Sequence, residues 1–315
     1  METGCVRRAW GFALAVCAVS GFAATFVFGG ALTRDCGISP AVLSFLRFLI
    51  AGLALLLSEA VTRSGRARLF APTRRDWMAF LWLAPVGTSL MAWCVFRGCA
   101  RVSTANASMA DALTPLMIFA VNALTTRRVS VRGLLGLACG FVGAVLVIQV
   151  VHSGGVALDA YSVGDVYILL SAALWGVYTV CGREPSCRLG ASVFTTWTML
   201  IGAAMMGLAV LVGDCVWPMT RRAWLLTLGL GVVSTLLPFW TWNAAQRFLP
   251  VSTLGMTAYF TPVIAVALGI VFLGETATPL QWLGTAFVIA SAVVETAGKR
   301  RIGVGTAKTK SAAKP

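Results

Sequence analysis

Apolar runs of roughly 20 residues recur along almost the whole chain, and each is long enough to cross the ~30 Å hydrocarbon core of a bilayer. Charged residues make up only 11% of the 315 positions, whereas an ordinary soluble domain carries about 25%. Water therefore cannot be the solvent for most of the surface, and the sequence predicts an integral membrane protein. Ten runs can be counted, over residues 10–32, 39–61, 77–96, 103–125, 131–151, 163–181, 189–212, 223–245, 251–273 and 280–298.

The composition of these runs favours helices over the strands of a membrane barrel. They are rich in Leu, Ala and Gly and lack the period-two alternation of barrel strands. In the fifth run, Gly133, Gly136, Gly140 and Gly143 fall on one helical face, which suits close packing of helices. The predicted fold class is all-α integral membrane, with ten transmembrane helices.

The second half of the chain repeats the first. Residues 98–122 align with residues 245–269, so that Thr114-Pro115 falls on Thr261-Pro262. Because each half holds five helices, an odd number, the second half enters the membrane from the opposite side and forms an inverted repeat. We expect one five-helix repeat over 10–151, a second over 163–298, and a basic disordered tail over 299–315.

Lysine and arginine positions predict the orientation. With a cytoplasmic N-terminus, nineteen of these residues lie in cytoplasmic segments and five in external ones. Both termini are therefore expected in the cytoplasm. The basic residues sit in short clusters between apolar runs, so the net charge of +14 does not indicate nucleic-acid binding.

Two ionisable residues lie inside apolar runs. A carboxylate at mid-membrane costs roughly 2.5–3.5 kcal/mol on insertion scales, so Asp111 is expected to face the bundle interior. It either binds a cationic group of a substrate, carries a proton, or forms a structural pair with Arg47 of the second run. Arg47 in turn either binds a substrate carboxylate or braces a neighbouring helix.

Prolines and aromatic residues form the remaining candidates. Pro115 and Pro262 each remove a backbone donor and either act as hinges or only kink their helices. Deeper polar and aromatic side chains either line a pocket for an amphipathic metabolite or pack in the core. The predicted substrate-binding set is Asn106, Asp111, Trp175, Tyr178, Trp240, Asn243 and Tyr259.

Several functional classes lack their motifs. The sequence has no Walker A or GxGxxG phosphate loop and no HExxH motif, and its nine cysteines form no CxxC pair. We therefore expect no enzyme activity, no catalytic residues, no metal and no cofactor.

Four sequence motifs carry a family resemblance: SPAVLSFLRF in the second run, ARVSTANASMADALTPL in the fourth, LLSAALWGVYTVCGR in the sixth and RFLPVSTLGMTAYFTPVIAVALGIVFLGE in the ninth. With the doubled repeat, they resemble the EamA-type ten-helix members of the drug/metabolite transporter superfamily. The resemblance implies a cytoplasmic-membrane carrier of small metabolites, often an amino-acid exporter. It also implies a cavity lined by helices one, three, four, six, eight and nine. The chain departs from the family pattern at Thr114, where an acidic residue is common, and at Ser20-Gly21, which stands where helix six has Trp175-Gly176.

The predicted function is a secondary transporter in which two inverted halves alternately expose a central cavity. Its partners would be a small-molecule substrate and the lipid bilayer, with protons as the candidate coupling ion through Asp111 and no nucleic acid. A lipid or lipid-linked headgroup carrier and a non-transport membrane sensor or scaffold are the alternatives. Monomer and homodimer both remain open.

Overall fold

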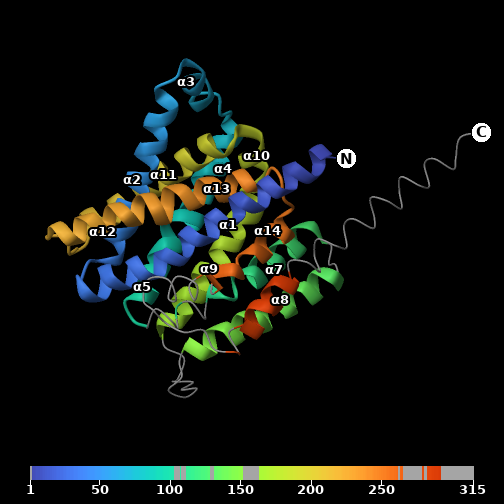
Figure 1. Ribbon diagram of the computed structural model, residues 1–315. Helices are drawn as coiled ribbons and strands as arrows, with labels where there is room; N and C mark the ends of the chain where they lie inside the picture. Colours follow the sequence, from blue (N-terminus) through green and yellow to red (C-terminus); the bar gives the residue numbers. More distant parts are fainter. Residues whose placement is uncertain are drawn as a thin grey trace, which may run out of the picture.

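The computed structural model describes residues 2–102, 107, 111–127, 131–151, 163–261, 263–264, 279 and 282–291. This part of the chain is helical and contains no strand (Figure 1). Six of its helices are long and apolar enough to cross a membrane, and three shorter apolar helices accompany them. The predicted all-α membrane fold is therefore confirmed. The predicted linker 152–162 and tail 299–315 lie outside the described residues.

The helices follow the predicted runs, with two short additions in the connections. The first half contains α1 (Glu2–Gly30), η1 (Ala31–Asp35), α2 (Pro40–Ala60), α3 (Arg63–Leu69), α4 (Arg74–Ala84), η2 (Pro85–Leu90), α5 (Met91–Cys99), α7 (Thr114–Thr126) and α8 (Val131–Val151). The second contains α9 (Val163–Cys181), α10 (Arg183–Leu189), α11 (Ala191–Val212), α12 (Arg221–Gly231), η3 (Val232–Leu236), α13 (Leu237–Ala245) and α14 (Val251–Thr257). Residues 282–291 are also helical.

Packing between the halves follows the symmetry of an inverted repeat. Helix α1 packs on α13 of the other half, and its repeat counterpart α9 packs on α5. Likewise α12 packs on α2, and α4 packs on α11. Helices α2 and α11 are counterparts and pack on each other. In Figure 1, α1 and α13 lie side by side although they are far apart in the sequence. The halves are therefore interleaved, and each covers apolar faces of the other.

The third membrane span of each half contains a π-helical segment at its centre, η2 in one half and η3 in the other. A π turn holds one residue more than an α turn and occurs frequently at functional sites. The fourth residue of each segment is a buried threonine, Thr88 in η2 and Thr235 in η3. Both hydroxyls donate to a carbonyl one turn earlier, of Ala84 and Leu230 respectively. The two segments therefore place matching hydroxyl groups in the two halves.

Pro115 occupies a different position from the one expected. The sequence predicted a proline in the middle of a continuous helix, but α7 begins at Thr114, so that Pro115 is in its first turn. Residues Ala112 and Leu113 form a turn just before it. A proline in the first helical turn loses no intrahelical hydrogen bond, which makes this a favourable start for a helix. The kink predicted at Pro115 is thus a helix start. Pro262 lies outside the described residues.

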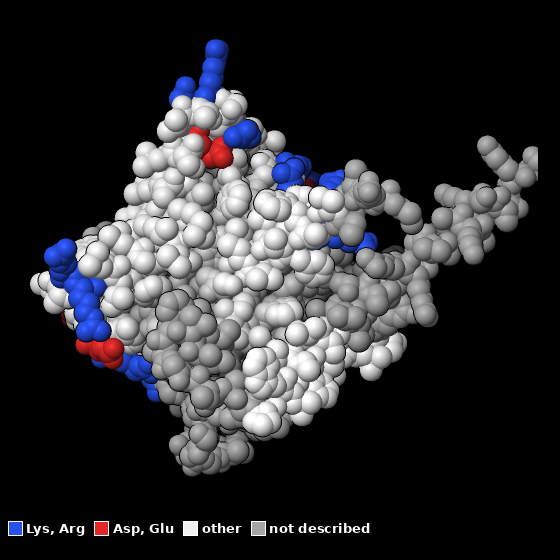
Figure 2. All heavy atoms as spheres, in the orientation of Figure 1, with Lys and Arg blue, Asp and Glu red and all other residues white. Residues whose placement is uncertain are grey.

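Charged residues gather at two opposite ends of the molecule. Figure 2 shows arginines over α3 and near α10, and again at the start of α12, with an uncharged surface between them. We refer to the end formed by α3, α10 and the start of α4 as the α10 end. The opposite end, formed by η1 and the starts of α2 and α12, is the η1 end. The uncharged belt is the surface expected to face lipid.

The glycines of α8 support close packing, as predicted. A Cβ at Gly140 would lie 2.4 Å from the Tyr259 ring, and one at Gly143 would lie 2.8 Å from the backbone oxygen of Gly284. These approaches leave no room for a methyl group. Helix α8 therefore lies close to the α14 segment and to residues 282–291.

Candidate functional site

A cavity lies between the two halves, and residues of both line it. Its volume is about 70 Å³, which holds only a few water molecules, since each needs at least roughly 10–15 Å³. The lining comes from the six helices that the family resemblance implied, and α2 adds Arg47. The lining residues are Val19, Phe22, Thr25, Phe26, Arg47, Met91, Val95, Asp111, Thr114, Ser171, Ala172, Trp175, Phe239, Trp242, Ala258 and Thr261.

Both predicted intramembrane charges reach this cavity. Asp111 is partly buried, and one of its carboxylate oxygens accepts a hydrogen bond of 2.9 Å from the Thr114 hydroxyl. Arg47 is only 2% exposed. No ion pair joins these two described residues, so the direct Arg47–Asp111 pair that the sequence allowed is absent. Each charge instead has a neutral partner of its own, and both remain on the cavity wall.

The η3 segment holds the guanidinium of Arg47. Its Nε donates to the Thr235 hydroxyl over 2.8 Å, and Nη2 donates to the Ser234 carbonyl over 3.3 Å. Three phenylalanine rings, those of Phe48, Phe96 and Phe239, surround it at 5.0, 5.4 and 5.9 Å. Cation–π attraction at such distances partly offsets the desolvation of a buried guanidinium. Arg47 is therefore stabilised in place as a charged group.

Aromatic side chains form a further part of the lining. Trp175 meets Phe22 at 5.1 Å and Phe239 at 5.0 Å, both edge to face. Phe22 also contacts Trp242 at 5.9 Å. Edge-to-face contacts give such a cluster a defined geometry. The cavity thus combines an apolar wall with one cation and one carboxylate, a lining that suits an amphipathic molecule.

Tyr178 and Asn243 lie together but do not line the cavity. The Asn243 amide donates to the Tyr178 hydroxyl over 3.2 Å and to the Thr195 hydroxyl over 2.9 Å. The Tyr178 ring stacks on Trp175 with centroids 5.3 Å apart. On the far side, the Ser186 hydroxyl of α10 donates to the Asn243 carbonyl. These fully buried groups form a polar layer between the cavity wall and the α10 end.

The other predicted site residues are dispersed. Trp240 donates its indole N–H to the Ser192 hydroxyl over 2.9 Å and does not line the cavity. Tyr259 is fully buried in a second apolar cluster, and its hydroxyl donates to the Leu137 carbonyl over 3.0 Å. Asn106 lies outside the described residues. Of the predicted set, the structure brings Asp111 and Trp175 together at the cavity, with Arg47.

Several lining residues were not among the predicted site. The hydroxyls of Thr25, Ser171 and Thr261 belong to the lining. Thr261 had a signal, because it is the repeat counterpart of Thr114 beside the paired prolines. Thr235 had none of its own, because isolated threonines are common in membrane helices. The need of Arg47 for a buried partner was the only pointer to it.

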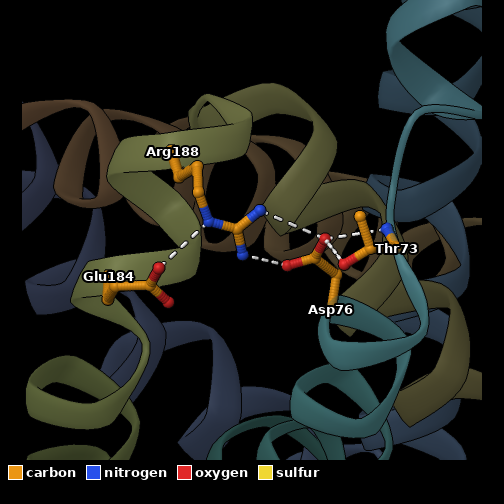
Figure 3. Close-up of polar contacts among 4 residues, drawn as sticks. All are labelled: Thr73, Asp76, Glu184 and Arg188. Carbon is orange, nitrogen blue, oxygen red and sulfur yellow. Dashed lines mark hydrogen bonds and ion pairs between the residues drawn. The ribbon is translucent and has the colours of Figure 1, made fainter.

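An ion pair joins the two halves at the α10 end (Figure 3). The Arg188 guanidinium of α10 pairs with both carboxylate oxygens of Asp76 in the first turn of α4. Its Nε donates to Glu184 over 3.0 Å, and the Thr73 hydroxyl donates to Asp76 over 2.7 Å. The hydrogen bonds to Asp76 and then to Glu184 raise the pKa of Arg188 above its ordinary value. Asp76 is fully buried, so this ion pair closes the α10 end over the polar layer.

Comparisons with known proteins agree on a membrane transporter. The family model described as the EamA-like transporter family matches residues 9–149 and again residues 162–296. The threonine/homoserine exporter RhtA of Salmonella typhimurium (strain SL1344) is 30% identical over 141 residues, which cover 44% of this chain and 46% of the exporter. The chain thus matches about half the length of that relative.

Two further matches extend over most of the chain. An uncharacterized inner membrane transporter of Escherichia coli (strain K12), YedA, is 23% identical over 261 residues, or 82% of each chain. One solved crystal structure is 21% identical, covers 93% of this chain and 99% of its own, and superposes with a TM-score of 0.74. That structure shows the same fold.

Proposed function

The chain belongs to the EamA-like transporter family, and we propose that it carries a small zwitterionic metabolite such as an amino acid across the cytoplasmic membrane. The observation that carries this proposal is that Arg47 and Asp111 line the same cavity without a direct ion pair between them. A guanidinium matches a carboxylate, and a carboxylate binds an ammonium group. The aromatic wall around Trp175 would contact the substrate side chain.

Alternating access is the proposed mechanism. The cavity is small and the α10 end is closed by an ion pair, so a substrate needs the halves, 10–151 and 163–298, to move relative to each other. Inverted repeats that rock about a midplane site are typical of secondary transporters. We assign the α10 end to the cytoplasm, because α3, α4 and α10 carry a cluster of arginines. The names of RhtA, an exporter, and YedA, an inner membrane transporter, support export and an inner-membrane location.

Asp111 has a further role in this proposal. When the site is empty, its carboxylate would take up a proton, and the ammonium group of the substrate would displace that proton. Inward proton movement would then drive outward substrate movement. The empty, protonated cavity would then carry one positive charge more than the loaded cavity, so each exchange would move one net positive charge inward.

Transport in proteoliposomes tests the proposal. The purified full-length protein should take up radiolabelled L-threonine or another member of an amino-acid panel, faster when a proton gradient is imposed. Asp111→Asn should reduce the initial rate at least tenfold and remove its dependence on pH, because the amide can neither pair with an ammonium group nor exchange a proton.

Asp214→Asn is the matched control, because Asp214 is exposed in the loop before α12. This variant should transport normally. Failure of the wild-type protein to carry any amino acid would contradict the substrate class. Normal transport and pH dependence in Asp111→Asn would contradict the role of Asp111.

A further inference from the structure

We propose that Thr235 is a positioning residue that holds Arg47 apart from Asp111, and that it thereby sets a preference for substrates bearing a carboxylate. The proposal rests on the proposed transport function. It assigns the π segment η3 a specific task, which is to fix the direction in which the Arg47 guanidinium faces the cavity.

The hydrogen bonds of Thr235 fix the direction of the interaction. A hydroxyl has one proton to donate, and Thr235 donates it to the Leu230 carbonyl over 2.8 Å, five residues earlier. Its oxygen is then left as an acceptor, and Arg47 Nε donates to it over 2.8 Å. The π turn brings the Leu230 carbonyl within reach of the Thr235 hydroxyl and leaves the hydroxyl oxygen facing Arg47. Thr235 therefore receives the guanidinium in a defined orientation.

Two of the three guanidinium nitrogens of Arg47 donate hydrogen bonds to η3. Nε donates to Thr235 and Nη2 to the Ser234 carbonyl, and among the described residues Nη1 has no hydrogen-bond partner. The three phenylalanine rings around Arg47 attract its charge, but they leave its direction free. The hydrogen bonds from η3 therefore determine where Nη1 is presented.

Arg47 has an alternative partner at the same cavity. Asp111 lines the same space, and within the described part of the chain its hydrogen-bond partner is the neutral Thr114 hydroxyl. In a low-dielectric site two opposite charges attract strongly, and an arginine side chain has enough freedom to swing. A direct Arg47–Asp111 pair would satisfy both charges and leave neither for a substrate. The anchor on Thr235 opposes that pairing.

The other half provides a natural control without a cation. Aligning Leu49-Ile50 with Leu200-Ile201 places Arg47 on Thr198. Thr88, the counterpart of Thr235 in η2, donates to the Ala84 carbonyl over 2.6 Å and reaches the Thr198 carbonyl at 3.3 Å. In both halves the threonine of the π segment thus bonds to the facing helix, but Thr235 accepts from the Arg47 side chain whereas Thr88 donates to a backbone carbonyl. Thr88 does not line the cavity.

Competition in proteoliposomes tests the positioning role. Uptake of L-threonine should show a KM about tenfold higher in Thr235→Val, the size expected for misplacing one charge-assisted hydrogen bond, with a maximal rate within twofold of wild type. Inhibition by L-threoninamide, which lacks the carboxylate, should be unchanged. Thr235→Ser should restore the wild-type KM, and Thr88→Val should leave both values unchanged. The proposal would be overturned if Thr235→Val weakened binding of L-threonine and of L-threoninamide equally. It would also be overturned if Thr88→Val raised the KM for L-threonine as much as Thr235→Val does.

A second measurement does not depend on transport. Arg47→Gln, Asp111→Asn and the double variant are compared by their changes in melting temperature. In the wild-type background the two single changes should add up to the change in the double variant, because the two charges form no pair there. In the Thr235→Val and Thr235→Ala backgrounds they should become non-additive, because the released guanidinium pairs with Asp111. Additivity in all backgrounds would overturn the inference. A wild-type protein that transports no amino acid would contradict only the proposed function.

Discussion

The two ends of the molecule join the same pair of halves by different chemistry. At the α10 end, buried Asp76 of α4 pairs with Arg188 of α10 through two charged hydrogen bonds. At the η1 end, Ser39 and Val216 exchange two neutral hydrogen bonds: the Ser39 N–H donates to the Val216 carbonyl over 3.1 Å, and the Val216 N–H donates to the Ser39 hydroxyl over 2.8 Å. Charged hydrogen bonds contribute about 1.5–3 kcal/mol each and neutral ones about 0.5–1.5 kcal/mol. The α10 end is therefore the more firmly closed.

The helices that begin at these two ends show how the difference arose within a repeated design. Thr73 caps α4 and Thr220 caps α12, and the two helices are repeat counterparts. The third residue after the cap is Asp76 in α4 but Ala223 in α12. The cap itself is shared by the halves, and the carboxylate that binds Arg188 is present in one of them only. The Asp76 carboxylate thus links the start of α4 to the other half, whereas the start of α12 has no such carboxylate.

Removing the carboxylate should have the largest effect. Asp76→Ala should lower the free energy of unfolding by about 2–3 kcal/mol, because it breaks the pair with Arg188 and removes the capping box. This is less than the loss from a fully buried pair, since the Arg188 side chain is 41% exposed and water can solvate it. Thermal unfolding in detergent, followed by tryptophan fluorescence, should show a melting temperature roughly 5 °C lower.

Ser39→Ala is the matched change at the η1 end. It removes the hydroxyl that accepts from Val216 and should cost about 1 kcal/mol. A cost at the η1 end equal to or above that of Asp76→Ala would remove the proposed difference between the two ends.

The paired caps should give the next largest effect. Thr73→Ala and Thr220→Ala each remove one N-cap, typically a loss of about 1 kcal/mol. Thr73→Ala should cost about 0.5–1 kcal/mol more, because its hydroxyl also donates to the Asp76 carboxylate over 2.7 Å, whereas Thr220 only accepts from the Ala223 N–H over 3.1 Å. The same unfolding assay measures both variants. In an Asp76→Ala background the two losses should become equal, and a persistent difference would show that Asp76 is not its cause.

How far the sequence predicted this arrangement depended on how much each residue stands out. Asp111 and Arg47 were found because a charge in an apolar run is conspicuous, and the halves were found because their prolines repeat. Tyr178 and Asn243 were predicted to bind substrate because they lie deep in their runs, but periodicity alone does not say whether such groups face a cavity or each other. The structure places them in a hydrogen-bonded layer behind Trp175.

The π segments left no trace in the sequence. Adding one residue to a helical turn changes neither the composition nor the apolar run, so η2 and η3 resemble any other part of their helices. The start of α7 at Thr114 was missed for a related reason: a proline is compatible with both a kink and a first turn, and the preceding turn decides between them.

Glu184 should contribute least to the difference between the ends. It accepts from Arg188 Nε over 3.0 Å, but its side chain is 59% exposed and its partner lies four residues away on the same short helix. Exposed pairs of this kind are worth about 0.3–0.5 kcal/mol, so Glu184→Gln should change the melting temperature by no more than about 1 °C. The amide oxygen still accepts from Nε, and Asp76 still binds the other two nitrogens. A loss comparable to that of Asp76→Ala would mean that α10 itself, by orienting Arg188 through Glu184, closes this end of the molecule, and that the contact between halves is secondary.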